Sequence, residues 1–180
     1  MIFTETKLPG AFLIELDKFE DERGFFARSW SEREFAAQGL DSRVAECNVS
    51  FNRRKATLRG MHYQRPPHGQ TKLVRCTRGA IFDVIIDLRP ASSTFKQWIS
   101  AELSADNHLA LYVPKDFAHG FQTLTDDSEI LYQMSDPFVP ESGAGVRWDD
   151  PAFGIVWPLP PSVISEKDQK LPFLNETKAL

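Results

Sequence analysis

Short runs of β-forming residues, separated by turn clusters rich in Pro and Gly, recur along the whole of this 180-residue chain. Ten of these runs are predicted to be strands: Ala11–Phe19, Phe25–Trp30, Val44–Ser50, Thr57–Gln64, Lys72–Thr77, Ala80–Leu88, Trp98–Leu103, Leu109–Val113, Gly120–Thr125 and Glu129–Met134. One open sheet of ten strands would leave an apolar face uncovered, so these strands require two packed sheets or a closed barrel. The sequence therefore predicts an all-β fold.

The expected architecture is a jelly roll of the cupin type, folded as one domain over residues 1–180. After Pro151 the chain becomes rich in proline. Because proline neither donates to a sheet nor continues a helix, we expect this C-terminal part to wrap the sandwich in extended form.

Local signals also predict one helix and one hairpin. The helix is expected at Glu32–Gln38, where Ser31 can cap the free N–H groups and Glu34 completes a capping box. Gly39 suits the left-handed exit from this helix. The dipeptide Arg78-Gly79 reads as the turn of a hairpin between two strands.

Composition limits the possible partners and the compartment. The net charge of −4 argues against a basic face, so we expect no binding to nucleic acid or to an anionic membrane. Cys47 and Cys76 lie far apart without a CxxC motif, and the first residues lack the pattern of a signal peptide. No apolar run approaches the length of a membrane span. We therefore expect a cytoplasmic protein with two reduced thiols.

The densest group of polar residues lies around the run Thr57–Gln64. A hairpin would bring Arg59 and His62 of this run close to Lys72 on the next strand. Strand alternation places His62 and Gln64 on one face, and only the register decides whether Lys72 shares it. The alternative is that His62 is a hydrogen-bonded core histidine and Lys72 a surface charge.

A second group, Pro114–Phe121, is expected to present His119 at the rim of a pocket. Cupins often bind a metal through two histidines one residue apart, a nearby Glu and a later His. Here Gln64 stands where the second His would be, and His62 with His119 are too few ligands. We expect neither a metal nor another cofactor.

The remaining residue types point to proton transfer. A Gly-x-Ser-x-Gly motif and a glycine-rich phosphate loop are both absent from the sequence. His62 is the natural base near neutral pH, Tyr132 is a candidate acid, and Lys72 is a cation for an enolate. The alternative for Tyr132 is a core aromatic ring with a satisfied hydroxyl.

The sequence resembles that of a known family, the dTDP-4-dehydrorhamnose 3,5-epimerases. The motifs that carry the resemblance cover nearly the whole chain: Asp21–Phe26, Leu58–Gln64, Lys72–Arg75, Phe82–Val84 with Asp87–Arg89, Pro114–Phe121, Trp148–Pro151 and Ser165–Asp168. The resemblance implies a jelly-roll homodimer. It also implies a cofactor-free epimerisation at C3 and C5 of a nucleotide-diphosphate sugar, on the route to dTDP-L-rhamnose. The apolar strand at Ala11–Leu16, if it were an exposed edge, would also favour pairing with another chain.

The resemblance assigns a role to each catalytic candidate. His62 resembles the proton acceptor, Asp168 its buried orienting partner, Lys72 the enolate stabiliser and Tyr132 the proton donor. A carboxylate that accepts from one imidazole nitrogen fixes the tautomer and leaves the other nitrogen free.

The resemblance also implies a set of substrate-binding residues. Arg23 and Arg59 would clamp the diphosphate, because a guanidinium offers a fork of donors. Phe26 and Phe138 would sandwich the base. The further positions are Asn48, His119 and Lys167, together with Arg28 and Glu46.

Three residues depart from the family pattern where nucleotide recognition is expected. Arg28 replaces a usual Glu, Glu46 a usual Gln, and Gly143 a usual acidic residue. The alternatives are therefore a CDP-linked or other nucleotide sugar, or inversion at C3 or C5 alone. Two further classes remain, a sugar-binding module without turnover and a metal-dependent cupin.

Overall fold

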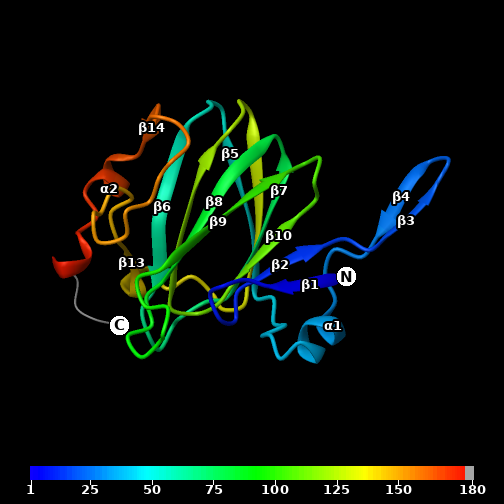
Figure 1. Cartoon of the computed structure of the whole chain (residues 1–180), viewed down its shortest axis with the longest axis horizontal. Coiled ribbons are helices and arrows are strands. Elements are labelled where there is room, and N and C mark those ends of the chain that lie inside the picture. The colour runs from blue at the N-terminus through cyan, green and yellow to red at the C-terminus, as the bar shows by residue number, and fades with distance from the viewer. Residues whose placement is uncertain (177–180) are drawn as a thin grey trace.

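The computed structural model describes residues 1–176 and shows two packed antiparallel sheets with a separate hairpin (Figure 1). The first sheet runs in the order β1 (Ile2–Glu5), β2 (Phe12–Glu15), β10 (Ala110–Val113), β7 (Lys72–Arg78), β12 (Ser128–Met134) and β5 (Glu46–Asn52). The second runs β13 (Gly143–Gly145), β6 (Thr57–Gln64), β11 (Phe117–Thr123), β8 (Ala80–Asp87) and β9 (Trp98–Ser104), with β14 (Val163–Ile164) parallel to β6. The predicted all-β jelly roll is confirmed.

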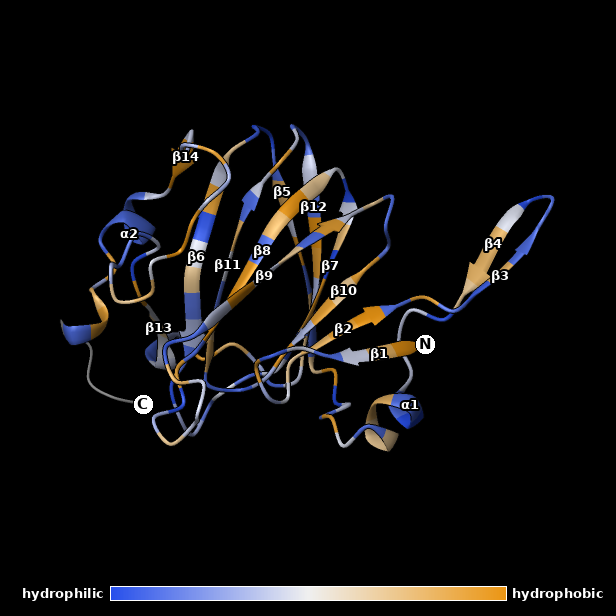
Figure 2. Ribbon diagram, viewed as in Figure 1, coloured by the Kyte–Doolittle hydropathy of each residue, from blue (hydrophilic) through white to orange (hydrophobic). Residues whose placement is uncertain are grey.

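The core lies between the two sheets, and apolar residues concentrate on its central strands (Figure 2). Val74 on β7, Ile85 on β8, Leu111 on β10 and Phe121 on β11 are all buried in it. The alternate residues on these central strands are also buried, because other segments cover the outer faces: Val84 and Ile86 of β8 belong to a second apolar cluster.

The C-terminal segment covers the outer face of the second sheet. Phe153, Ile155 and Trp157 pack with Met61 of β6 and Val84 of β8. This is the wrap that the proline-rich composition predicts. The segment also forms the short helix α2 (Glu166–Gln169), which the sequence did not indicate. The remaining short helices are η1 (Pro140–Ser142) and η2 (Leu174–Glu176).

Two predicted connections were wrong. Strand β7 lies in the first sheet, while its neighbours in sequence, β6 and β8, lie in the second. Neither Gln64 to Lys72 nor Arg78-Gly79 is therefore a hairpin, because the chain crosses between sheets at both places. Gly79 makes the second crossing possible: it has a φ of +75°, and a Cβ there would lie 2.4 Å from the Thr125 hydroxyl oxygen.

The N-terminal region forms β-strands, as predicted, but these strands are divided and paired differently from the prediction. The expected strand Ala11–Phe19 is divided into β2 and β3 (Lys18–Asp21), and β3 forms a hairpin with β4 (Gly24–Ala27). Strand β2 lies between β1 and β10. It is therefore not the exposed edge that would favour pairing with another chain, because β1 covers it.

Helix α1 (Glu32–Ala37) forms where its cap predicts it. The Ser31 hydroxyl accepts from the backbone N–H of Glu34 at 3.4 Å, and Gly39 has a φ of +71°. The capping box is not formed, because the Glu34 carboxylate accepts from the Met1 ammonium at 2.8 Å and from Arg28 at 3.0 Å. No described helix is both long and apolar enough to cross a membrane.

Candidate active site

A cavity of about 270 Å³ opens between the two sheets on the side where β5 and β6 face each other. It is lined by Asn48, Ser50, Arg59, His62, Lys72, His119, Gly120, Phe121, Tyr132 and Met134. A second cavity of about 290 Å³ shares His62, Lys72 and Met134 with the first, and extends toward Phe138 and Lys167. Together they form one continuous cleft with most of the predicted polar residues along it.

A bulge in β6 brings Arg59 and His62 to the same side of the strand. His62 pairs with His119 of β11, but Arg59 pairs with Phe121, so two residues of β6 stand opposite Gly120. Simple alternation would put Arg59 and His62 on opposite faces, and the extra residue cancels it. Glycine is needed here because a Cβ on Gly120 would lie 2.7 Å from the carbonyl oxygen of Arg59.

The imidazole of His62 is held by Asp168. Strand β14 pairs with β6 and leads directly into α2, which carries Asp168 to the base of the cleft. His62 Nε2 lies 2.7 Å from Asp168 Oδ1, while Asp168 Oδ2 accepts from the Gly60 N–H at 3.3 Å. Burial alone would raise the pKa of Asp168, but the hydrogen bonds from His62, Gly60 and Ser165 hold it below its usual value. The carboxylate is therefore ionised, and Nε2 must carry the proton.

Lys72 reaches the same place from the opposite sheet. Its Nζ donates to the backbone carbonyl of His62 at 3.3 Å, so the expected proximity arises across the sandwich and not through a hairpin. Burial lowers the pKa of Lys72 to about 8, against the opposing effect of the Asp83 carboxylate. Lys72 is therefore a half-buried cation that faces the cleft, and its interpretation as a surface charge was wrong.

His119 and Asp83 form a second histidine–carboxylate pair that the sequence did not indicate. His119 is buried, and its Nε2 lies 2.8 Å from Oδ1 of the fully buried Asp83 on β8. Burial lowers the pKa of His119, although Asp83 opposes the shift. The available signal was one acidic residue inside the apolar run Ala80–Ile86, where an unpaired charge is costly.

Tyr132 completes the group from β12. Its ring meets His119 edge to face, with centroids 6.0 Å apart. Burial raises the pKa of Tyr132 well above its ordinary value, and the hydrogen bond with the Ser50 side chain only partly opposes this. The phenol is therefore protonated throughout the neutral range and remains able to donate.

Comparison with known proteins shows the family to which this chain belongs. The family model for dTDP-4-dehydrorhamnose 3,5-epimerase matches residues 5–176. The chain belongs to the dTDP-4-dehydrorhamnose 3,5-epimerase family. A relative of that name from Sinorhizobium fredii is 44% identical over 177 residues, covering 98% of this chain and 91% of the relative.

Solved structures of epimerases have the same fold. The enzyme from Bacillus anthracis, solved with TDP and PPi bound, is 42% identical with a TM-score of 0.93 over 96% of this chain and 99% of that one. The Legionella pneumophila enzyme in complex with dTDP-4-keto-L-rhamnose is 36% identical, with a TM-score of 0.92 over 99% of this chain and 95% of that one. ChmJ, a 3'-monoepimerase from Streptomyces bikiniensis in complex with dTDP-quinovose, is 34% identical, with a TM-score of 0.87 over 94% of this chain and 86% of that one.

The epimerase cleft continues toward the residues expected to bind the nucleotide. Phe138 is 56% exposed beside the second cavity, and its N–H donates to Glu46 Oε1 at 3.3 Å. Asn48 lines the first cavity and Lys167 the second. Gly143 lies beside the Phe138 ring, since a Cβ there would be 3.6 Å from that ring.

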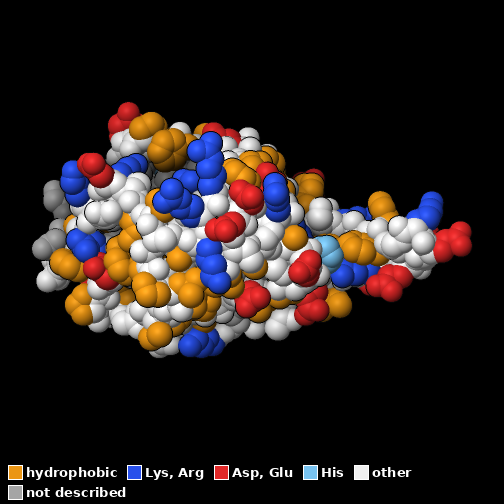
Figure 3. All heavy atoms as spheres, turned by 90° about the horizontal axis from the view of Figure 1, so that it is seen from above, with side chains coloured by type: hydrophobic (Ala, Val, Ile, Leu, Met, Phe, Trp, Pro, Cys, Tyr) orange, Lys and Arg blue, Asp and Glu red, His pale blue; other side chains and the backbone are white. Residues whose placement is uncertain are grey.

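The other expected nucleotide-binding residues of this epimerase lie far from the cleft within one chain. The β3–β4 hairpin projects beyond the sheets, with charged residues at its tip (Figures 1 and 3). Arg23 pairs with Asp21 on this hairpin, and Phe26 is 76% exposed on it. One chain therefore brings neither Arg23 to Arg59 nor Phe26 to Phe138. Arg28, just after the hairpin, pairs with Glu34 at 3.0 Å.

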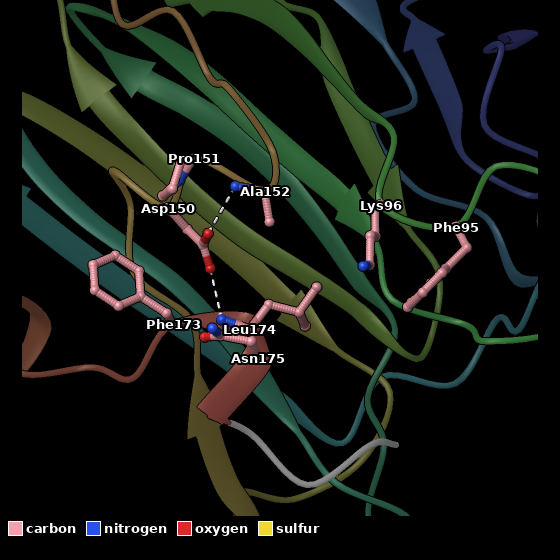
Figure 4. A pocket seen from close by; sticks show the side chains of 8 residues that line it. All are labelled: Phe95, Lys96, Asp150, Pro151, Ala152, Phe173, Leu174 and Asn175. Atoms are coloured by element: carbon pink, nitrogen blue, oxygen red, sulfur yellow. Dashed lines mark hydrogen bonds between the residues drawn. The ribbon is translucent and has the colours of Figure 1, made fainter.

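A larger cavity of about 490 Å³ lies elsewhere, between the Phe95-Lys96 turn and the C-terminal wrap (Figure 4). Its buried carboxylate, Asp150, accepts from the N–H groups of Ala152 at 2.8 Å and Leu174 at 2.6 Å, so it serves to hold the wrap. None of the candidate catalytic residues lines this cavity. Over residues 1–176 no cluster of three or more His, Cys, Asp or Glu is placed to hold a metal ion.

Proposed function

We propose that this chain converts dTDP-4-keto-6-deoxyglucose to dTDP-4-keto-L-rhamnose by inverting C3 and C5 through proton abstraction and reprotonation. The observation that carries the proposal is the Asp168–His62 pair facing Lys72 in one cleft, with His62 Nε2 2.7 Å from Asp168 Oδ1. A C–H group beside a ketone becomes acidic only when its enolate is stabilised. A base and a half-buried cation in one cavity meet this requirement.

In the proposed reaction His62 takes the proton. In the neutral imidazole, donation from Nε2 to Asp168 leaves the other nitrogen, Nδ1, as the atom that accepts a proton from C3 or C5. Lys72 stabilises the negative charge that develops on the C4 oxygen. Both carbons flank that oxygen, so one base and one cation serve both inversions in turn.

Tyr132 then returns a proton from the opposite face of the sugar. Its raised pKa supports this role, because the phenol arrives at the enolate in its protonated form. The same raised pKa makes the phenolate a strong base that recovers its proton readily once the product has left. Asn48 and His119, which line the same cavity, are assigned to the sugar.

The nucleotide is assigned to the second cavity. The exposed Phe138 ring offers a stacking face for the base, and Lys167 offers a cation near the diphosphate. Arg59 is held at the cleft because its Nε donates to the buried Asn52 at 2.7 Å and its Nη2 to the Phe51 carbonyl at 3.5 Å, and a guanidinium held in this way has further N–H groups to offer the diphosphate.

We further propose that the active form is a homodimer in which each hairpin completes the partner's cleft. Arg23 and Phe26 lie too far from their own cleft to bind its substrate. The hairpin also exposes Phe19 and Phe25, while the edge strand β5 exposes Val49. Unpaired edges with apolar side chains are surfaces that another chain covers. The two free thiols, Cys47 and Cys76, fit the cytoplasm, where we place this dimer.

Solvent exchange tests the reaction. The protein is incubated with dTDP-4-keto-6-deoxyglucose in heavy water, with and without exhaustive chelation, and deuterium is located by NMR. We expect deuterium at both C5 and C3 without added metal. No exchange at either carbon would overturn the proposal, and loss of exchange on chelation would overturn its metal-free chemistry. Exchange at one carbon would identify a monoepimerase, the activity named for the similar ChmJ.

A further inference from the structure

The carboxylate of Asp83 is the least satisfied charge among residues 1–176. The residue is fully buried on β8, and only Oδ1 has a partner, His119 Nε2 at 2.8 Å. Oδ2 is buried without a hydrogen bond. A buried carboxylate in this state is costly, so its retention requires compensation by a nearby positive charge.

Lys72 is the cation on which this carboxylate acts, and it lines the same cavity as His119, the hydrogen-bond partner of Asp83. The titratable and charged groups around its ammonium come from four strands and a helix: Arg59, His62 and Tyr63 on β6, Asp83 on β8, His119 on β11, Tyr132 on β12, and Lys167 and Asp168 on α2. Of the two carboxylates in this group, Asp168 is hydrogen-bonded to His62. Asp83 is the one whose charge acts on Lys72, and it also acts on His119 and Tyr132.

We propose that Asp83 is a positioning residue, the counter-ion that keeps Lys72 as an ammonium ion and holds His119 in one tautomer beneath the sugar. The inference rests on the proposed epimerisation and adds a residue to it. Asp83 does not line either cavity of the cleft, so it acts through Lys72 and His119 and not on the substrate.

The reaction needs such a residue because the cleft makes two opposing demands on Lys72. Excluding water strengthens the attraction between an ammonium ion and an enolate, but it also favours the uncharged amine. A fixed negative charge behind the lysine resolves this conflict without competing for the C4 oxygen. The bond from His119 Nε2–H to Asp83 likewise leaves Nδ1 as an acceptor for a sugar hydroxyl.

The test compares Asp83→Asn with Asp87→Asn. Asp87 is an equally buried carboxylate on the same strand, but it is bonded to Arg89, Ser92 and Thr94 and lies outside the cleft. For Asp83→Asn we expect the alkaline limb of the kcat–pH profile to move down by about 1 pH unit, with KM changed less than about threefold. Asp87→Asn should lower the melting temperature and leave the limb in place. Equal profiles in the two variants would overturn the inference.

A second measurement covers the case in which Asp83→Asn does not fold. Competitive labelling of Lys72 in the native protein, with an amine-reactive reagent over a range of pH, reports its titration directly. We expect a midpoint near 8. A midpoint at about 6 or below, typical of a buried lysine without a counter-ion, would overturn the inference. Labelling does not depend on turnover, so it separates this failure from a failure of the proposed reaction.

Discussion

His62 on β6 and His119 on β11 are direct cross-strand partners, and a carboxylate holds the Nε2 atom of each, Asp168 at 2.7 Å and Asp83 at 2.8 Å. The two pairs differ in exposure. The side chain of His62 is 41% exposed to the cleft and that of His119 only 5%. The more accessible ring is the one that we propose as the base, and the buried ring forms part of the cleft wall.

Removing the base should abolish exchange at both carbons. For His62→Ala we expect deuterium incorporation at C3 and C5 to fall by about a hundredfold to ten-thousandfold, because no second group takes over the proton. Asp168→Asn should follow in the same direction, since an amide does not fix the same tautomer. His68→Ala, in a surface turn, is the matched control and should exchange normally. Exchange at one carbon in His62→Ala would show a second base.

Removing the acid should separate exchange from inversion. In Tyr132→Phe the base and the cation remain, so the substrate should still lose its C–H label to solvent while little epimer forms. Tyr112→Phe is the control, because the Tyr112 hydroxyl bonds the Asp41 backbone outside the cleft. Label washout and epimer yield are measured on the same samples. Equal losses of both in Tyr132→Phe would contradict this division of roles.

If each β3–β4 hairpin completes the cleft of the partner chain, two variants that are inactive alone should restore activity when they are mixed. Arg23→Ala and His62→Ala should each be nearly inactive alone. Mixed and reassociated, they should recover about a quarter of native activity, because each hybrid dimer holds one cleft with both residues intact. If Arg23 serves its own chain, no hybrid has an intact cleft and the mixture stays inactive. A monomer in dilute sedimentation experiments would also contradict the assignment.

The ion pair of Arg28 predicts that this residue does not choose the base. Cytosine offers acceptors that would suit a guanidinium, but Arg28 Nη1 is bound to Glu34 Oε1 at 3.0 Å. The ratio of dTDP to CDP affinities should therefore be unchanged, within about threefold, in Arg28→Glu. Calorimetry with both nucleotides measures it. A larger change in the ratio would show that Arg28 leaves Glu34 to read the base.

Asp87 predicts a loss of stability in acid. Burial would raise its pKa, but hydrogen bonds from Arg89, Ser92 and Thr94 lower it to about 2 from 3.8. A depressed folded-state pKa contributes stability above the unfolded value, and this contribution is lost as pH falls toward 2. Asp87→Asn should cost about 2 kcal/mol of unfolding free energy at pH 7 and progressively less below pH 4.

Denaturant unfolding at pH 7, 4 and 2.5 measures this convergence. The control is Asp106→Asn, which changes an exposed aspartate and should run parallel to the native protein at every pH. A deficit in Asp87→Asn that stays constant from pH 7 to 2.5 would mean that the charge of Asp87 contributes nothing to stability.

The sequence by itself determined most of the strands, the helix at Glu32 and the chemistry of the candidate residues, but it did not indicate β1, β13 or β14 and it joined β2 and β3 into one strand. Strand and cap signals are local, since they depend on alternation and on side chains within a few positions, so β6 was predicted at its observed bounds, Thr57–Gln64. Arg59 and His62 were named for the same reason: their motif is contiguous.

Only the tertiary structure decided how these residues meet. Pairing joins residues distant in sequence, so alternation could not show the bulge that turns Arg59 to the side of His62, or that Lys72 arrives from the opposite sheet. Asp83 had no role until β8 was placed beside β11. The hairpin was equally ambiguous, because the side chains of Arg23 and Phe26 specify what they can bind, but the direction of a projecting strand pair depends on packing against the rest of the molecule.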